Sequence, residues 1–301
     1  MTARNPTTFI IGAGPVATAL AGAMRLGGVP VLGLWARRAA QARHAGSVAG
    51  VAAFSSAPPD LVLEAEVAIL AVSDGAIGGV AEMLLGTGLV TKRHVLLHCG
   101  GAASAEDVFR DVRSRVGGVG TLHPLSAIAD AKIAMRAIRG TAFGVEGDDR
   151  GSAMAAKLAT ALGGVVLPLR GEQMAAYHAA AALASNYIVA MLDAAAQVIA
   201  SAGVSSADAT NALVALAEGA LQNVVAHGTT YGLTGPVRRG DAATVERHLE
   251  ALGTQPNVLE IYRVLARQAA EIAGRMTTDP GALQSAPDPT GLDAIRGLLQ
   301  R

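Results

Sequence analysis

A glycine-rich turn near the amino terminus constrains the fold of this chain more than any other feature. The residues Gly12-Ala13-Gly14-Pro15-Val16-Ala17 follow a short apolar run, Thr8–Gly12, and open a helical pattern over Pro15–Leu26. The first glycine permits a tight turn, the second lets backbone approach a pyrophosphate, and the small third residue lets the helix pack on the strand. In this position the pattern predicts a loop that binds a dinucleotide at a helix N-terminus. An ordinary strand–helix turn is the alternative.

Short apolar runs alternate with alanine-rich, helix-patterned stretches through the first half of the chain. Each run has the length of a buried strand, and such alternation favours a parallel sheet with helices on both faces. The expected strands are Thr8–Gly12, Val29–Trp35, Val67–Val72, His94–His98, Gly117–Leu122, Thr141–Gly147 and Gly164–Leu169.

The pattern changes after Gly171, where strand signals stop and long helical periods begin. The expected helices are Glu172–Ala202, Ser206–Ala226, Ala242–Leu252 and Pro256–Gly274. We therefore predict an α/β fold in which a Rossmann-type, doubly wound, mostly parallel sheet over residues 1–170 binds the nucleotide, and an all-α C-terminal domain over residues 171–301 follows.

The end of the second expected strand indicates which dinucleotide binds. An NAD-binding fold usually places Asp or Glu there, to hold the ribose 2′-hydroxyl. Here the residues are Trp35-Ala36-Arg37-Arg38, and the first acidic residue of the chain is Asp60. Two adjacent guanidinium groups suit a 2′-phosphate, and no carboxylate repels it. We predict NADP(H), the alternative being a solvated helix start on a positively charged surface.

A short polar sequence follows the next buried strand. Val72, Ser73 and Asp74 come directly after that apolar run. Ligands of open parallel sheets lie at the carboxyl ends of strands, so these residues are expected to border the cofactor ribose or nicotinamide. Asp74 is equally suited to capping the helix expected from Ala76, and the two roles are compatible.

Charge and cysteine content exclude several classes of function. The 24 basic and 24 acidic residues give no net charge, which speaks against a nucleic-acid or membrane-surface partner. The single cysteine, Cys99, allows no intrachain disulfide and gives no support to an oxidising compartment. The longest uncharged apolar stretch, Ala179–Leu192, is too short to span a bilayer and contains Ser185 and Asn186. We expect a cytoplasmic protein with no membrane partner.

The seven histidines do not predict a metal site. The chain has neither a C-x-x-C nor an H-E-x-x-H pattern. His94 and His98 lie on one face of an expected strand but are about 13 Å apart, too far to share one ion. We expect no structural zinc.

Two other histidines are candidates for the chemistry. His123, followed by Pro124, comes directly after a strand that should end at the cofactor edge, where it would contact substrate or nicotinamide; a turn histidine before a rigid proline is the alternative. His178 and Asn186 fall on one face of an alanine-rich helix. Polar groups on an apolar face need partners or a ligand, so they form either a satisfied core pair or part of a site.

A polar loop is expected before the third helix of the second half. Over Leu233–Asp241 it supplies the Thr234 hydroxyl, the guanidinium groups of Arg238 and Arg239, and a carboxylate at Asp241 that can cap the helix. Such a set can hold a carboxylate substrate. The alternative is a surface loop with solvated arginines.

Six stretches that occur in order resemble a known group of proteins. They are GAGPVA at 12–17, LAVSD at 70–74, HCGGAAS at 98–104, TLHPL at 121–125, YHAAAALASN at 177–186 and LTGPVRRGD at 233–241. The chain resembles, over nearly its whole length, Rossmann-like bacterial proteins with a helical C-terminal domain of formally unknown function. These are distant relatives of ketopantoate reductases, pyrroline-5-carboxylate reductases and 3-hydroxyisobutyrate dehydrogenases. The last three stretches are the distinctive ones.

The resemblance implies an NADP-dependent reductase of a small oxo acid or imino acid, with ketopantoate-like chemistry as the first expectation. In the related dehydrogenases a lysine, with an asparagine one or two turns on, faces the nicotinamide. His178 looks like the occupant of the lysine position and Asn186 like the later asparagine. Ala182 stands where a nearer asparagine is expected, which is a departure from the pattern.

We therefore predict that His178 donates the proton that accompanies hydride transfer, because imidazole titrates near neutrality, and that Asn186 orients the substrate or His178. His123, Thr234 and Arg239 would bind the substrate carboxylate. Alanine-rich faces over Glu172–Ala226 predict a homodimer through the helical domain. The alternative functions are a redox-inert NADP(H) sensor and a structural protein with a vestigial nucleotide fold.

Overall fold

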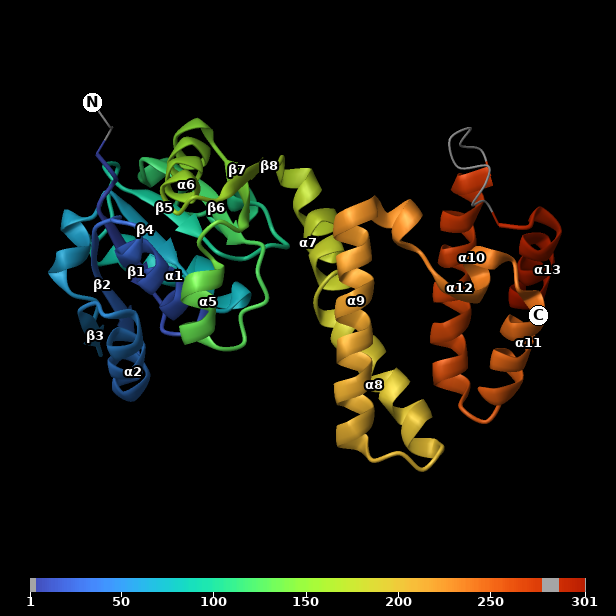
Figure 1. The fold of residues 1–301 in the computed structure, drawn as a ribbon. Coiled ribbons are helices and arrows are strands. Elements are labelled where there is room, and N and C mark those ends of the chain that lie inside the picture. Colours follow the sequence, from blue (N-terminus) through green and yellow to red (C-terminus); the bar gives the residue numbers. More distant parts are fainter. Residues whose placement is uncertain (1–3, 278–286, 301) are drawn as a thin grey trace. The chain divides into compact units, whose positions relative to one another are not determined.

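The structure is a computed structural model and describes residues 4–277 and 287–300. Its internal contacts divide the chain into two compact units, Met1–Ser185 and Asn186–Arg301 (Figure 1). This division falls after the boundary near residue 170 expected from sequence. Tyr177, which lies beyond that expected boundary, is within hydrogen-bond distance of His123 in the same unit.

The first unit is built on one eight-stranded sheet in the order β3-β2-β1-β4-β5-β6-β7-β8 (Figure 1). All neighbouring strands are parallel except β6 and β7, which are antiparallel. The strands are β1 (Thr8–Ile11), β2 (Val31–Ala36), β3 (Ala53–Ser55), β4 (Val67–Leu70), β5 (Val95–His98), β6 (Gly118–Pro124), β7 (Ala142–Gly147) and β8 (Val165–Pro168). The predicted Rossmann-type, mostly parallel sheet is confirmed. β3 was not expected, since three residues give no periodic signal.

Helices cover both faces of the sheet, and each face has its own apolar core. The α-helices of this unit are α1 (Pro15–Leu26), α2 (Ala39–Ala49), α3 (Ile77–Gly86), α4 (Ala105–Val108), α5 (Ala131–Ala137), α6 (Asp149–Ala161) and α7 (Met174–Leu183). Buried residues of α1, α2, α5 and α6 share one core, and those of α3 and α4 share the other. Successive residues of β1 alternate between the two: Ile10 belongs to the first core, and Phe9 and Ile11 to the second.

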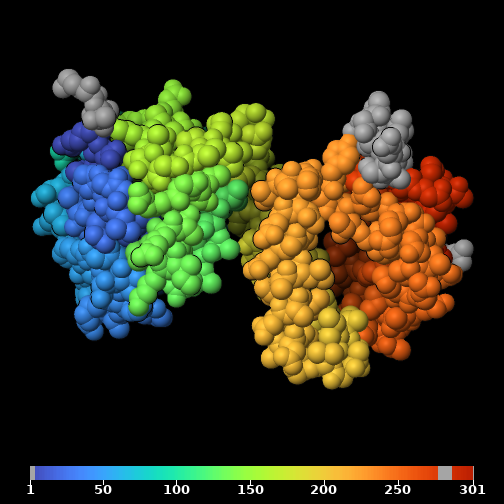
Figure 2. Space-filling model, viewed as in Figure 1, coloured from blue at the N-terminus to red at the C-terminus, as the bar shows by residue number. Residues whose placement is uncertain are grey.

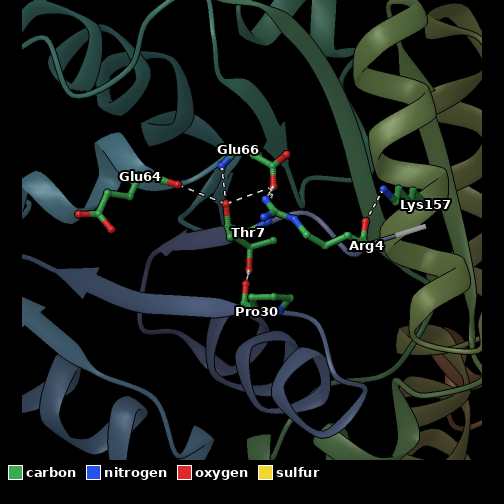
Figure 3. Close-up of polar contacts among 7 residues, drawn as sticks. Arg4, Thr7, Pro30, Glu64, Glu66 and Lys157 are labelled. Atoms are coloured by element: carbon green, nitrogen blue, oxygen red, sulfur yellow. Dashed lines mark hydrogen bonds and ion pairs between the residues drawn. The ribbon is translucent and has the colours of Figure 1, made fainter. Parts of the chain in front are cut away.

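Polar contacts at the amino end of β1 tie it to its neighbours (Figure 3). The Glu66 carboxylate accepts hydrogen bonds from the Thr7 amide at 2.9 Å and from Arg4 at 2.8 Å. The first of these, ahead of the Arg4 contacts, holds the pKa of Glu66 below its usual value. Lys157 of α6 donates to the Arg4 carbonyl at 2.7 Å. These contacts fasten the end of the sheet opposite to the predicted site.

The second unit is helical, as predicted. Its α-helices are α8 (Asn186–Ser201), α9 (Ser206–Gly232), α10 (Gly235–Arg239), α11 (Ala242–Ala251), α12 (Pro256–Thr277) and α13 (Pro289–Gln300). The Ser205 hydroxyl caps α9 by accepting from the Asp208 amide, and Asp241 caps α11 by accepting from the Thr244 amide. α9 is kinked at Gly228, whose φ of 71° is not helical.

The expectation of one continuous helix over Glu172–Ala202 is wrong. A turn at Ala184 and Ser185 separates α7 from α8. Serine and asparagine side chains compete with helical backbone hydrogen bonds and favour helix ends, which accounts for the interruption before Asn186. The shared helical face proposed for His178 and Asn186 is therefore not formed.

Apolar side chains stay exposed on the helices of the second unit. α8 and α9 pack against each other, and Figure 2 shows them in space-filling form in yellow to light orange. Tyr187, Val189, Leu216 and Val225 are among their exposed side chains. The stretch Gly171–Ser201, which contains α7, α8 and the turn between them, is apolar and long enough to cross a membrane, judged by length and composition only, and 6 % of its most apolar window is buried. This chain alone thus leaves an apolar surface uncovered.

Candidate functional site

A pocket of about 700 Å³ opens at the carboxyl edge of β1, β2 and β4. It is the position that open α/β sheets use for ligands. The structure brings together here every residue predicted to bind the cofactor: Gly12, Ala13, Gly14, Pro15, Val16, Arg37, Arg38, Val72, Ser73 and Asp74.

Glycine occupies positions 12 and 14 of the turn for different physical reasons. Gly12 has a φ of 133°, and a Cβ there would collide with the carbonyl of Ala71, the residue after β4, so the fold itself requires glycine. Gly14 has a φ of −73° and no atom within 4 Å of a Cβ position, so nothing in the chain demands glycine there. Gly14 also precedes Pro15 at the first turn of α1. A ligand that approaches the backbone at Gly14 would explain its identity.

Arg37 and Arg38 are exposed at the rim of this pocket, just after β2. Neither forms an ion pair with a carboxylate in the described part of the chain. Their neighbour Trp35 is 5 % exposed, and its indole Nε1 has no hydrogen-bond partner among the described residues. The rim therefore carries two positive charges that no carboxylate of the described residues neutralises.

Ser73 and Asp74 are exposed where β4 ends. Asp74 begins a 3-10 turn, Asp74–Ala76, and no side-chain cap bond is formed at the start of that turn or of α3. The capping role weighed for Asp74 is therefore not observed, whereas its position on the pocket is. Cys99 lines the same pocket; burial, followed by the charge of Asp74, raises the pKa of its thiol to about 12, so it stays protonated.

A cluster of two histidines, His123 and His178, lies next to the pocket, at the carboxyl ends of β5 and β6. Gly100 approaches Asp74 so closely that a Cβ there would lie 2.9 Å from the carboxylate Oδ1. At Gly101 a Cβ would lie 2.6 Å from His178 Cδ2 and 2.8 Å from His123 Nε2. The His123 and His178 rings meet edge to face with centroids 5.8 Å apart. The two glycines thus connect the cofactor pocket to both predicted histidines.

His123 is held from its other side by Tyr177. The Nδ1 atom of His123 and the Tyr177 hydroxyl are 2.9 Å apart. Burial first, then the charge of His178, lowers the pKa of His123 to about 4, although Asp74 opposes the shift. At neutral pH His123 is therefore an uncharged imidazole, which cannot form an ion pair with a substrate carboxylate.

A buried chain of polar side chains lies beneath this cluster. The Gly100 amide donates to His98 Nδ1 at 3.1 Å, so the ring proton is on Nε2, which lies 2.9 Å from the Thr121 hydroxyl. Thr121 donates in turn to Glu146 at 3.0 Å, and the Ala105 amide donates to the same carboxylate at 2.8 Å. Three adjacent strands, β5, β6 and β7, supply these side chains. This series of hydrogen-bonded side chains fixes the backbone at Gly100 and, through it, at Gly101.

The remaining predicted residues, Asn186, Thr234 and Arg239, lie in the second unit. Asn186 is the first residue of α8 and is exposed. His178 of the first unit is exposed too, so the alternative of a buried core pair of His178 and Asn186 does not hold. Thr234 is the exposed N-cap residue of α10, and Arg239 ends that helix 3.8 Å from the Asp241 carboxylate. The expected loop before α11 is thus partly helical, because Pro236 sits well in a first helical turn. The structure places Asn186, Thr234 and Arg239 in one unit and the histidine pair in the other.

The sequence reasoning overlooked several polar residues of this region. Tyr177 precedes His178 in the sequence, but only His178 was predicted to have a functional role. Thr121 and Glu146 are polar residues inside otherwise buried strands, a break in pattern that can be read from sequence. Across residues 4–277 and 287–300, no three His, Cys, Asp or Glu side chains are grouped to hold a metal ion.

Comparison with known proteins places the chain among folds of this type. The family model described as Domain of unknown function (DUF2520) matches residues 141–269. The structure of protein TM1727 from Thermotoga maritima superposes with a TM-score of 0.69 at 24 % identity, covering 89 % of this chain and 98 % of that one. No curated protein matches the sequence.

Two solved enzymes share the fold at lower identity. Pyrroline-5-carboxylate reductase (proC) from Coxiella burnetii gives a TM-score of 0.56 at 16 % identity, over 89 % of this chain and 99 % of that one. A reductive aminase from Aspergillus terreus, solved with NADPH and ethyl-5-oxohexanoate, gives 0.58 at 17 % identity, over 96 % and 98 %. At these identities the similarity establishes the fold.

The buried imidazole of His98 predicts a stability that falls with acid. Burial, followed by the charge of His123, lowers the pKa of His98 from 6.5 to about 4. Below pH 6.5 the unfolded chain takes up a proton that the folded chain refuses, so stability is lost as the pH falls from about 6.5 to about 4. The loss for His98 is about 3 kcal/mol, and His123 adds a loss of the same sign.

Urea unfolding followed by the fluorescence of Trp35, the only tryptophan, reports on the first unit alone. The free energy of unfolding should decline across this range in the native protein and decline less in His98→Asn. An equal pH dependence in both proteins would show that His98 is not the group responsible.

Proposed function

We propose that this protein is an NADP(H)-dependent oxidoreductase that reduces a small oxo acid or imino acid, with a ketopantoate-like acid as the first candidate substrate. The observation that carries the proposal is the continuity between a dinucleotide pocket with unpaired arginines and a cluster of histidines at the same sheet edge. The shared fold of a pyrroline-5-carboxylate reductase and of a reductive aminase solved with NADPH supports it.

The residues of the pocket fit NADP(H). The Gly12–Val16 turn and the start of α1 would hold the pyrophosphate, since a helix N-terminus attracts anions and Gly14 leaves its backbone open. Arg37 and Arg38 would hold the 2′-phosphate, because no carboxylate of residues 4–277 or 287–300 pairs with them and no acidic residue precedes Asp60 in the sequence. Val72, Ser73 and Asp74 would border the ribose and nicotinamide. When bound, the reduced cofactor supplies a hydride.

Polar residues predicted from the sequence would bind and protonate the substrate. In this proposal His178 donates a proton to the atom that gains negative charge, and Asn186 orients the substrate. Thr234 and Arg239 bind the substrate carboxylate, and His123 contributes an uncharged hydrogen-bonding group. Whether the reduced bond is C=O or C=N is left to experiment.

The test is NADPH oxidation across a panel of 2-oxo acids and cyclic imines. Turnover of at least one acid or imine supports the reductase. NADPH binding without turnover would favour a redox-inert sensor, and no nucleotide binding would reject both.

Cofactor choice gives the sharpest prediction. Replacing both Arg37 and Arg38 by alanine should weaken NADPH binding about tenfold or more while NADH binding changes little, because each lost charge-assisted bond is worth about 1.5–3 kcal/mol. Trp35 lines the same pocket, so quenching of its fluorescence measures both affinities. Gly14→Val should block both nucleotides without loss of stability. Equal weakening for NADPH and NADH in the double variant would reject the 2′-phosphate assignment.

The role of His178 predicts a catalytic loss without a structural one. His178→Ala should lower turnover by about 10²–10⁴-fold, the usual span for a general acid. Melting temperature and NADPH affinity should stay near native values, since His178 is exposed and does not line the cofactor pocket. Asn186→Ala should cost less. His44→Ala removes another exposed histidine of the same unit as a control, and similar turnover in both histidine variants would refute the role.

We further propose that the protein is a cytoplasmic homodimer joined through its helical unit, with no membrane or nucleic-acid partner. Exposed apolar side chains on α8 and α9 support a protein partner for this face. Insertion of 171–201 into a bilayer would instead bury the polar side chains of His178, Asn186 and Asp193 and the turn at Ser185, which is costly. A second copy of the chain supplies a matching apolar face.

Sedimentation equilibrium tests the dimer. The native protein should have twice the chain mass of 30.2 kDa at micromolar concentration. Leu216→Glu with Val225→Glu should give monomers, since these side chains are 71 % and 88 % exposed in the single chain, while NADPH affinity should persist. A native mass of 30.2 kDa would overturn the proposal, as would native protein that sediments with lipid vesicles.

A further inference from the structure

Tyr177 has no role in the function proposed above, yet its hydroxyl makes a polar contact with His123. Its hydroxyl lies 2.9 Å from His123 Nδ1, and the two rings meet edge to face with planes 87° apart. Both residues belong to the unit Met1–Ser185: His123 near the end of β6, and Tyr177 on α7. The contact therefore rests on one compact unit.

The backbone makes room for this tyrosine. Gly144 of β7 pairs with His123 of β6, and a Cβ at Gly144 would lie 2.7 Å from both Cζ and Oη of Tyr177. Glycine inside a strand weakens the strand and often marks a close approach. Here the approaching group is the phenol, so the strand is shaped to accept it.

The position of the Tyr177 hydroxyl indicates which ring nitrogen of His123 carries the proton. Burial raises the pKa of Tyr177, so its phenol stays protonated and can donate to His123 Nδ1, 2.9 Å away. When Nδ1 accepts this bond, the proton of the neutral ring stands on Nε2. A Cβ at Gly101 would lie 2.8 Å from that atom and 2.6 Å from His178 Cδ2.

We propose that His123 donates a hydrogen bond through Nε2–H to the oxygen or nitrogen of the bond being reduced, and that Tyr177 is the positioning residue that keeps His123 in this tautomer. The proposal rests on the reductase function and deepens it. It replaces binding of the substrate carboxylate by His123 with polarisation of the reacting bond. An uncharged imidazole held in one tautomer is an established way to polarise a carbonyl.

The step balances without a charge on His123. The substrate carbon receives a hydride from the reduced nicotinamide, and the π electron pair of the C=O or C=N bond moves to the oxygen or nitrogen. That atom takes its proton from His178. His123 and Tyr177 keep their protons and stabilise the charge as it develops, which is the task of a preorganised donor.

The chain contains a matched control. His248 Nδ1 and the Tyr262 hydroxyl are also 2.9 Å apart, with ring planes at 87°, in the second unit. Tyr262→Phe therefore breaks a pair of the same geometry outside the proposed machinery. Tyr177→Phe and Tyr262→Phe remove one hydroxyl each and leave the aromatic ring.

The first measurement needs no substrate. Long-range 1H–15N correlation spectra of histidine-labelled protein at pH 7, assigned with His123→Asn, report the protonated nitrogen of His123 directly. We expect the Nε2–H tautomer in the native protein and in Tyr262→Phe, and a mixture of tautomers in Tyr177→Phe. A cationic or Nδ1–H ring in the native protein would overturn the proposal.

The second measurement is turnover with the substrate found in the panel. Tyr177→Phe should lower kcat by about 10–100-fold with little change in NADPH affinity, and Tyr262→Phe should be neutral. His123→Gln keeps an N–H donor and should retain more activity than His123→Leu, which has none. Equal activity of those two variants, or full activity of Tyr177→Phe with an altered tautomer, would refute the role. If the native protein reduces nothing, the reductase proposal fails while the spectra still decide the tautomer.

Discussion

Parallel strands end at a common edge, and the candidate site depends on that constraint. The carboxyl ends of β1, β2, β4, β5 and β6 lie at the same edge of the sheet, so residues far apart in sequence meet there. The turn after β1 brings a helix N-terminus, the end of β2 brings two guanidinium groups, and the end of β6 brings His123. The glycine pair after β5 lies between them. Side chains of useful chemistry reach one place without any long loop.

The one antiparallel pairing in the sheet adds a second device. Because β7 runs against β6, Glu146 lies opposite Thr121 and Gly144 opposite His123. The first pairing continues the buried chain from His98, and the second opens space for the Tyr177 ring. His98 is thereby held in one tautomer by neighbours that are themselves hydrogen-bonded, and the Tyr177 hydroxyl lies within hydrogen-bond distance of His123 Nδ1. Buried polar groups of this kind rigidify a structure when every member is satisfied.

Local patterns predicted the first half of the fold because each element there carries its own signal. The apolar runs mark the strands, and Gly12 to Ala17 marks the turn, so residues that line the pocket could be named from the sequence. The helical half was predicted in outline only. The break before Asn186 is set by Ser185 and Asn186, whose preference against helix interiors is weak, and the short helix over Gly235–Arg239 is set by packing that no single period reveals.

The histidine cluster shows why site chemistry is harder to predict than site location. His123 was identified from its place at a strand end, but its charge depends on burial and on His178, which comes from another element. Its tautomer depends on Tyr177 and on the absence of a side chain at Gly144. None of these neighbours is close to His123 in sequence, so the sequence alone led to the prediction that His123 binds the substrate carboxylate. Only the folded arrangement shows an uncharged ring whose Nε2 faces His178, and with it a donor suited to a developing charge rather than to a full one.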